Sequence, residues 1–137
     1  PLGFFGNFVV ESIGDQEKAF DIKSAMMPII DYARIYALKH QIVIPNTLER
    51  LKRLYDAGMM DLQKYQELQQ AYSYLMQIRL THQSQCVSQR VETINNYISP
   101  KKLTFIEQKI LKEIFTQTKY FQTTLSYDFT GRLDGAL

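Results

Sequence analysis

The sequence of 137 residues lacks the features that mark several large classes of protein. A single cysteine, Cys86, excludes an internal disulfide framework and fits a reducing compartment. No run approaches the ~20 apolar residues of a membrane span, and the start of the chain lacks the basic segment of a signal peptide. The net charge of +2 is too small to predict attraction to nucleic acid or to a membrane surface. We therefore expect a cytoplasmic protein with neither a membrane nor a nucleic-acid partner.

Motifs of common catalytic and metal sites are also missing. There is no glycine-rich phosphate loop, no Gly-x-Ser-x-Gly and no paired-histidine helix motif. His82 and Cys86 are one helical turn apart, but only His40 remains as a further soft ligand, and a zinc site needs three or four. We expect no metal site, no cofactor and no catalysis by this chain alone.

The composition itself is that of a packed domain. With 45% hydrophobic and 22% charged residues, the chain can bury a core, and its length suits one domain spanning residues 1–137. Residues 1–24 form a lead-in, 25–127 a helical bundle and 128–137 a tail. Because the sequence begins with Pro1 rather than methionine, we expect it to be an excised piece of a larger protein or a processed product.

The lead-in has short apolar clusters on either side of Gly14-Asp15. That pattern is typical of two short extended segments around a turn, although an irregular lead-in fits equally well. From about residue 25 to His40 the apolar residues follow a helical period, which places Pro28 in the first turn of a helix.

Capping signals predict two further helices. Asn46 with Glu49 has the spacing of a capping box, and Gly58 is a natural residue to end the helix that follows. Asp61 caps a third helix that no glycine or proline interrupts, so this helix is expected to reach about Glu92.

A fourth helix follows a loop at Asn95–Pro100. Thr104 with Glu107 forms a second capping box. The inward residues of this helix are expected to be Ile106, Ile110, Ile114, Phe121 and Leu125. Helices joined by short connections bury their apolar faces against each other, which predicts an all-α, antiparallel four-helix-type bundle with an irregular or short β-like lead-in.

Two polar residues interrupt the apolar face of the third helix. That face comprises Tyr65, Leu68, Tyr72, Leu75, Arg79, His82 and Cys86. A buried guanidinium without a partner costs several kcal/mol, so a carboxylate or a ligand anion should face Arg79. With Asp21, Lys23, Asp31, Arg34 and Arg50, these residues would form a charged cluster rich in cations. The cluster is either a structural ion-pair network or a pocket for a phosphate or another acidic group.

Arg34 and His40 have the Arg–five residues–His spacing that resembles the signature of RNA-cleaving HEPN toxins. Six positions along a helix rotate two side chains by about 240°, so they converge only near a helix end. A ribonuclease-like function is therefore one hypothesis, and two unrelated residues near a helix end are the alternative.

A wider resemblance involves six stretches in a fixed order. These stretches are Asp21-Ile22-Lys23, Pro28 through Arg34, Asn46 through Leu51, Ala71-Tyr72 with Leu75, Arg79-Leu80 with His82-Gln83, and Asn96 through Pro100 leading to Leu103. Together they resemble the family of nucleotidyltransferase substrate-binding domains. In that family the domain lies at the C-terminal end of bacterial signal-transduction proteins that also carry CBS and cyclic-nucleotide-binding domains.

The resemblance implies a helical bundle packed in cis against a nucleotidyltransferase domain similar to that of the protein-PII uridylyltransferases. Such a domain has a Gly-Ser dipeptide followed by an Asp-x-Asp pair, a pattern that does not occur in this sequence. Mg²⁺ and a nucleoside triphosphate are therefore expected on that other domain, and no catalytic residue is assigned here. The acceptor, a protein or a small molecule, is not identified by the resemblance.

The resemblance also supplies motif positions, namely Asp21, Lys23, Asp31, Arg34, Thr47, Arg50, Arg79 and Gln83. From these and the apolar-face residues, we predict substrate binding by Arg34, Arg50, Arg79, Lys23, His82 and Gln83, with Asp21 and Asp31 as acidic partners. The three arginines are the predicted contacts to anionic groups. An alternative is a non-enzymatic helical module that docks a sensory domain or dimerises through an apolar patch at Phe4, Phe5 and Phe8.

Overall fold

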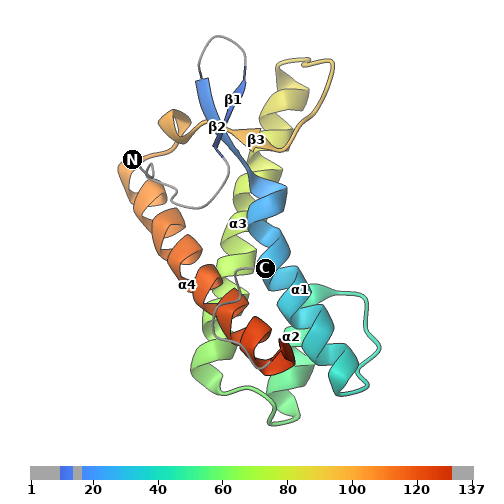
Figure 1. Ribbon diagram of the computed structural model, residues 1–137. Coiled ribbons are helices and arrows are strands. Elements are labelled where there is room, and N and C mark those ends of the chain that lie inside the picture. Colours follow the sequence, from blue (N-terminus) through green and yellow to red (C-terminus); the bar gives the residue numbers. More distant parts are fainter. Residues whose placement is uncertain (1–9, 14–16, 131–137) are drawn as a thin grey trace.

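A small sheet sits at one end of a helical bundle (Figure 1). The computed structural model describes residues 10–13 and 17–130. The strands are β1 (Val10–Ile13), β2 (Glu17–Asp21) and β3 (Tyr97–Ile98), antiparallel in the order β1-β2-β3. The predicted β-like lead-in is confirmed. The third strand lies within a segment that was predicted to be a loop. It forms by pairing with β2, which is far away in the sequence, so the residues around it carry no local pattern that would predict a strand.

The first helix, α1 (Ile22–Lys39), begins directly after β2. The Asp21 carboxylate accepts hydrogen bonds from the backbone N–H groups of Lys23 at 2.9 Å and Ser24 at 3.3 Å, as an N-cap does. The helix therefore starts earlier than predicted. Pro28 lies in the helix interior, not in the first turn, and it removes one backbone hydrogen bond there.

The second helix, α2 (Thr47–Asp56), has the predicted ends. Asn46 Oδ1 accepts the backbone N–H of Glu49 at 3.1 Å, which confirms the N-cap. At the other end Gly58 adopts a φ of +74°, the left-handed conformation that ends many helices.

The third helix, α3 (Leu62–Ser88), is capped by Asp61, which accepts the backbone N–H of Lys64 at 2.7 Å. The helix ends before Glu92, so the predicted end was too late. Arg90 takes a φ of +54° and the backbone N–H of Val91 bonds to the carbonyl of Cys86 at 3.0 Å. This closing pattern is usually marked by glycine, and the sequence carries no such mark here.

The fourth helix, α4 (Phe105–Thr130), follows a single 3₁₀ turn, η1 (Pro100–Lys102). The predicted cap is confirmed, since Thr104 Oγ1 accepts the backbone N–H of Glu107 at 3.2 Å. The prediction that Ile106 and Ile110 face inward is wrong, because they are 69% and 38% exposed. Ile114 and Phe121 are buried as predicted, and the rest of the buried face is Leu111, Phe115 and Thr118.

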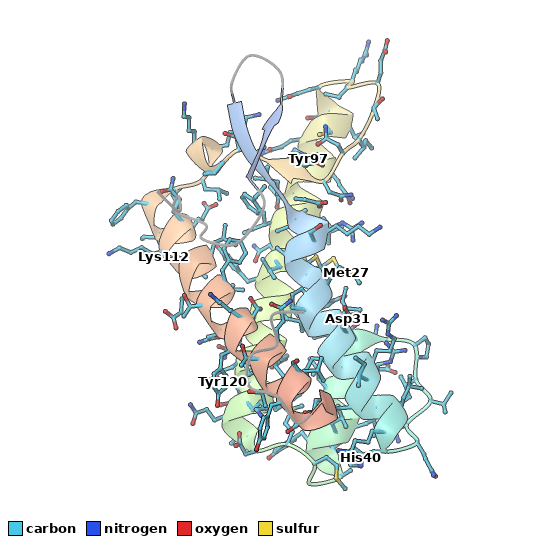
Figure 2. All side chains as sticks on the ribbon, in the orientation of Figure 1. Met27, Asp31, His40, Tyr97, Lys112 and Tyr120 are labelled. Carbon is cyan, nitrogen blue, oxygen red and sulfur yellow. The ribbon has the colours of Figure 1, made fainter. Side chains whose placement is uncertain are left out.

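Helix α1 lies in the middle of the bundle and packs against α2, α3 and α4, while α2 also packs on α3. Aromatic contacts join α4 to β2 and α1. The Phe115 ring lies edge-on to the Phe20 ring with 6.0 Å between the ring centroids, and the Phe121 and Tyr32 ring centroids are 5.8 Å apart. Figure 2 shows Lys112 and Tyr120 on the outer side of α4, away from α1. The predicted all-α bundle is confirmed. Among the described residues, no helix has the length and apolar character that a membrane span requires.

Candidate functional site

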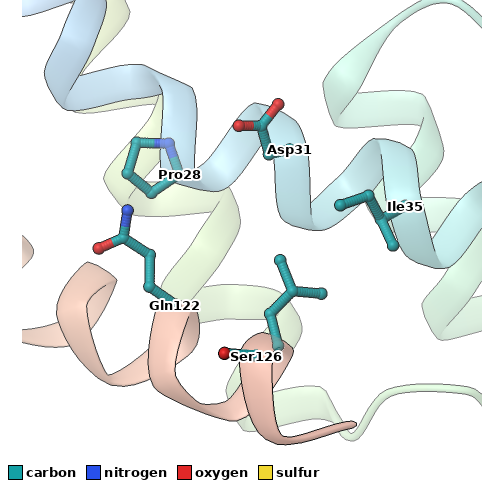
Figure 3. Close-up of a pocket in the computed structure, with 6 residues that line it drawn as sticks. Pro28, Asp31, Ile35, Gln122 and Ser126 are labelled. Carbon is teal, nitrogen blue, oxygen red and sulfur yellow. The ribbon is translucent and has the colours of Figure 1, made fainter. Parts of the chain in front are cut away.

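A groove opens between α1 and α4 (Figure 3). Its volume is about 400 Å³, within the ~300–1,000 Å³ range of small-molecule sites. It is lined by Pro28, Asp31 and Ile35 from α1 and by Gln122, Leu125 and Ser126 from α4. We call this feature the α1–α4 groove.

The groove combines an apolar surface with a few polar groups because each wall is one helical stripe. Residues at i, i+3 and i+7 share a face of α1, and residues at i, i+3 and i+4 share a face of α4. Pro28, Ile35 and Leu125 provide the apolar part. In Figure 3 the Gln122 side chain extends from α4 toward Pro28. An apolar wall with few convergent polar groups is the usual composition of a ligand site.

Asp31 and Arg34 form an ion pair at the α1 rim of the groove. Arg34 Nη2 donates to Asp31 Oδ1 at 2.8 Å, and both side chains are partly open to solvent, at 50% and 36% exposure for Arg34 and Asp31. Such an exposed pair contributes at most about 1 kcal/mol to stability. Among the described residues, the Asp31 carboxylate accepts no other hydrogen bond, so its second oxygen can accept one from a ligand.

Two tyrosines of α1 lie close to the groove. Tyr32 is buried under Phe121, and burial raises its pKa above the usual value despite the nearby Lys64 ammonium. The Tyr36 hydroxyl donates to Asp128 Oδ2, which ties α1 to the C-terminal part of α4. Burial and this hydrogen bond raise the pKa of Tyr36. Both tyrosines therefore stay neutral and fix the spacing of the two groove walls.

The predicted charged cluster is not a single cluster. Lys23 and Arg34 are eleven residues apart on α1, which is about 16 Å along the helix axis. Asp21 is the N-cap of α1, and Lys23 is exposed. Of the predicted acidic residues, only Asp31 forms an ion pair with one of the predicted cations.

The other two arginines have neutral partners. Arg79 Nε donates to the amide oxygen of Asn96 at 3.2 Å, and Arg50 Nε donates to the carbonyl of Ile44 at 2.5 Å. In the part of the chain that the structure describes, no carboxylate pairs with Arg79. The other predicted partner of Arg79, a ligand anion, stays a prediction. Each arginine anchors a loop to its helix: the segment before β3 for Arg79 and the segment before α2 for Arg50.

The remaining predicted residues lie on α3 and near the helix ends. His82 Nε2 lies 3.7 Å from Cys86 Sγ, and His82 and Gln83 are both partly buried. Thr47 is buried at the start of α2. Within the described ranges, no three His, Cys, Asp or Glu side chains are gathered where they could hold a metal ion.

Arg34 and His40, the pair with the ribonuclease-like spacing, have different surroundings in the structure. Arg34 is engaged with Asp31, and His40 is the C-cap residue of α1. Gln122 and Ser126, which line the groove, were not predicted from the sequence. The available signal was their i and i+4 spacing around Leu125, but nothing in the sequence indicates which helix lies opposite.

The described residues form a helical bundle with an open, partly polar groove between α1 and α4. Comparison with protein families identifies it further: residues 1–129 match the model of the family described as "Putative nucleotidyltransferase substrate binding domain". The chain belongs to this family, as its motifs predicted. Comparisons with curated proteins and with solved structures find no match.

Proposed function

We propose that this chain binds the acceptor of a nucleotidyl transfer in the α1–α4 groove and presents it to a nucleotidyltransferase domain of the same polypeptide. Family membership over residues 1–129 supports the substrate-binding role. The observation that carries the choice of site is the groove of about 400 Å³, with Asp31, Gln122 and Ser126 at its surface.

In the proposed reaction a nucleophilic atom of the acceptor bonds to the α-phosphorus of a nucleoside triphosphate. The bond from that phosphorus to the bridging oxygen breaks, pyrophosphate leaves, and the acceptor proton passes to solvent. Mg²⁺ on the other domain would neutralise phosphate charge. This chain's part is to bind and orient the acceptor, as the family description of a substrate-binding domain supports.

Orientation alone can account for a large effect, because fixing an acceptor next to a reactive phosphate removes much of the entropy cost of a two-molecule reaction. Holding both domains on one chain raises their effective concentration further. The proposed setting is a bacterial signal-transduction protein in the cytoplasm, where nucleoside triphosphates are made. CBS or cyclic-nucleotide-binding domains of the same protein would regulate the transfer.

The test uses the full-length product of the gene with each nucleoside triphosphate, radiolabelled at the α-phosphorus. The acceptor pool is a cell extract separated into a low-mass fraction and a protein fraction. We expect label to appear in one fraction and to depend on the full-length protein. The absence of labelled product from both fractions, with all four nucleotides, would overturn the proposed function.

A second candidate function is a docking module, and an exposed apolar patch favours it. Phe105 and Ile106 at the start of α4 are 70% and 69% exposed. Lys109 lies 4.6 Å above the Phe105 ring, and the preceding η1 turn exposes Lys101 and Lys102. This patch suits an apolar surface bordered by acidic residues on a neighbouring domain. The alternative patch at Phe4, Phe5 and Phe8 lies outside the described residues.

The double variant Phe105→Ser, Ile106→Ser tests this module. If the patch serves association between copies of the chain, light scattering will show that the wild type dimerises and the variant does not. If it serves docking of a neighbouring domain, the variant will loosen that contact in the full-length protein and increase its proteolysis. A variant that matches the wild type in both measurements would contradict the docking role.

A further inference from the structure

We propose that two copies of this chain associate through the outer face of α3, related by a two-fold axis. We define the α3 outer face by exposed residues on the side of the helix away from the core: Leu62, Gln66, Ser73, Gln77, Leu80 and Val87. This surface is distinct from the α1–α4 groove, and the inference goes beyond the proposed transfer reaction.

The exposed residues of α3 are all uncharged. The structure describes the whole of this helix, and each of its exposed positions is occupied by glutamine, serine, threonine, leucine or valine. Its charged residues, Lys64, Glu67 and Arg79, are partly buried. Helix α2 has a more usual surface, with an exposed ion pair of Lys52 and Asp56 at 2.9 Å. Charged residues are mostly exposed in folded proteins, and their depletion marks the centre of protein–protein interfaces.

The α3 outer face is a continuous stripe along a helix of 27 residues. Its residues are spaced by three, four or seven positions, so they share one side of the helix over about 37 Å. The buried residues Leu68, Ala71, Leu75 and Ile78 lie on the opposite side, and α1 and α2 pack against α3. Figure 1 shows α3 running along most of the bundle. A second helix can therefore lie along this stripe without displacing another element.

The lack of charge favours a second copy as the occupant. A two-fold axis places a surface against the same surface of the partner, so each charge on it would face a like charge, which opposes association. A different partner is usually recognised through charges of opposite sign, and this face offers none. The Gln66 and Gln77 side chains form no hydrogen bond with other described residues. An amide both donates and accepts, so each can pair with an amide of the second copy.

Three aliphatic side chains supply the apolar contact. Leu62, Leu80 and Val87 are 49%, 56% and 62% exposed, and a two-fold dimer buries both copies of each. Burial of apolar surface is the main favourable contribution to most protein association. Three such residues per copy are few compared with a permanent dimer, so we expect association that is reversed by dilution.

The test is sedimentation equilibrium of the 137-residue chain over a range of concentrations. We expect the mass to rise from 16.0 kDa toward twice that value. Two double variants place charges at the middle of the face: Ser73→Glu with Gln77→Glu, and Ser73→Lys with Gln77→Lys. Each alone should weaken association at least about tenfold, because like charges then meet whether the two helices run parallel or antiparallel. An equimolar mixture of the two variants should associate again, because opposite charges then meet. Variants that had lost their fold would not recover in this way.

The control carries the same change on another helix. Thr116→Glu with Tyr120→Glu also places two carboxylates four residues apart on an exposed surface, the outer side of α4. This variant should sediment as the wild type does. Thermal unfolding checks that every variant keeps the fold.

The inference is overturned if the wild type stays monomeric up to about 1 mM, if the α3 variants associate as the wild type does, or if their mixture fails to recover. It is also overturned if Phe105→Ser, Ile106→Ser abolishes association and the α3 variants do not, because the dimer would then form through α4. Nucleotide transfer by the full-length protein is measured separately, so the proposed function can fail or hold independently of this result.

Discussion

At the residue scale, the helix ends show which structural features the sequence could predict and which it could not. Gly58 predicted the end of α2 because glycine tolerates a φ of +74°. The ends of α1 and α3 have the same closing geometry with Gln41 at φ +59° and Arg90 at φ +54°. Glutamine and arginine are not typical of a left-handed backbone conformation, so the sequence did not indicate that α3 ends before Glu92.

These two positions predict gains in stability. Gln41→Gly and Arg90→Gly should each raise the free energy of unfolding by a few tenths to about 1 kcal/mol. A residue with a Cβ atom is strained in the left-handed conformation, and glycine is not. Urea unfolding measures this. The control is Gly58→Ala, which should lower the free energy by about 1 kcal/mol. No atom lies within 4 Å of the added Cβ, so that loss reports the backbone alone. Glycine variants less stable than wild type would contradict the assignment.

Tyr36 predicts a pH dependence. Its pKa is raised from the usual 10.0 by burial first and then by the hydrogen bond to Asp128. Above about pH 10 the unfolded chain therefore loses this proton before the folded chain does, and the free energy of unfolding falls as pH rises. At neutral pH the hydroxyl is protonated in both states and contributes no such slope.

Tyr36→Phe should flatten this alkaline fall, as measured by urea unfolding across the alkaline range. Tyr120→Phe is the matched control, because Tyr120 is on the outer side of α4 and 66% exposed. An equal slope for wild type and Tyr36→Phe would show that Tyr36 is not protected in the folded state.

At the element scale, the orientation of α4 is the main point that the sequence left undetermined. Ile106, Ile110 and Ile114 fit a four-residue repeat, but so does the overlapping stripe that contains Leu111 and Phe115. The structure buries Leu111 and Phe115 together with Ile114 and exposes Ile106 and Ile110, because Phe115 and Phe121 contact Phe20 and Tyr32. Local periodicity cannot decide between two adjacent apolar stripes without knowing the partner helix.

This orientation predicts unequal effects for two similar truncations. Leu111→Ala should lower the free energy of unfolding by about 2–4 kcal/mol, because Leu111 is fully buried and its loss leaves a cavity. Ile106→Ala should change it by less than about 0.5 kcal/mol, because Ile106 is 69% exposed. Urea unfolding of both variants measures the difference. A larger loss at Ile106 than at Leu111 would mean that α4 is rotated about its axis.

At the scale of the whole molecule, the fold class and family were accessible from the sequence because capping residues, periodicity and ordered motifs are local signals. The groove was not accessible, since its walls come from α1 and α4 at opposite ends of the chain. Of the residues predicted for the site, Asp31 lines this groove and Arg34 forms an ion pair with it. Gln122 and Ser126 became visible only when the two helices were placed side by side.

The most direct test of the account compares nucleotide transfer by three forms of the full-length protein: wild type, Asp31→Asn and Asp56→Asn. Transfer of label from the α-phosphorus of a nucleoside triphosphate to the acceptor fraction is measured over a range of acceptor concentrations. The account predicts that Asp31→Asn needs about tenfold more acceptor to reach half the maximal rate. Asp56→Asn should match the wild type. Equal acceptor dependence for all three proteins would contradict the assignment of the α1–α4 groove as the acceptor site.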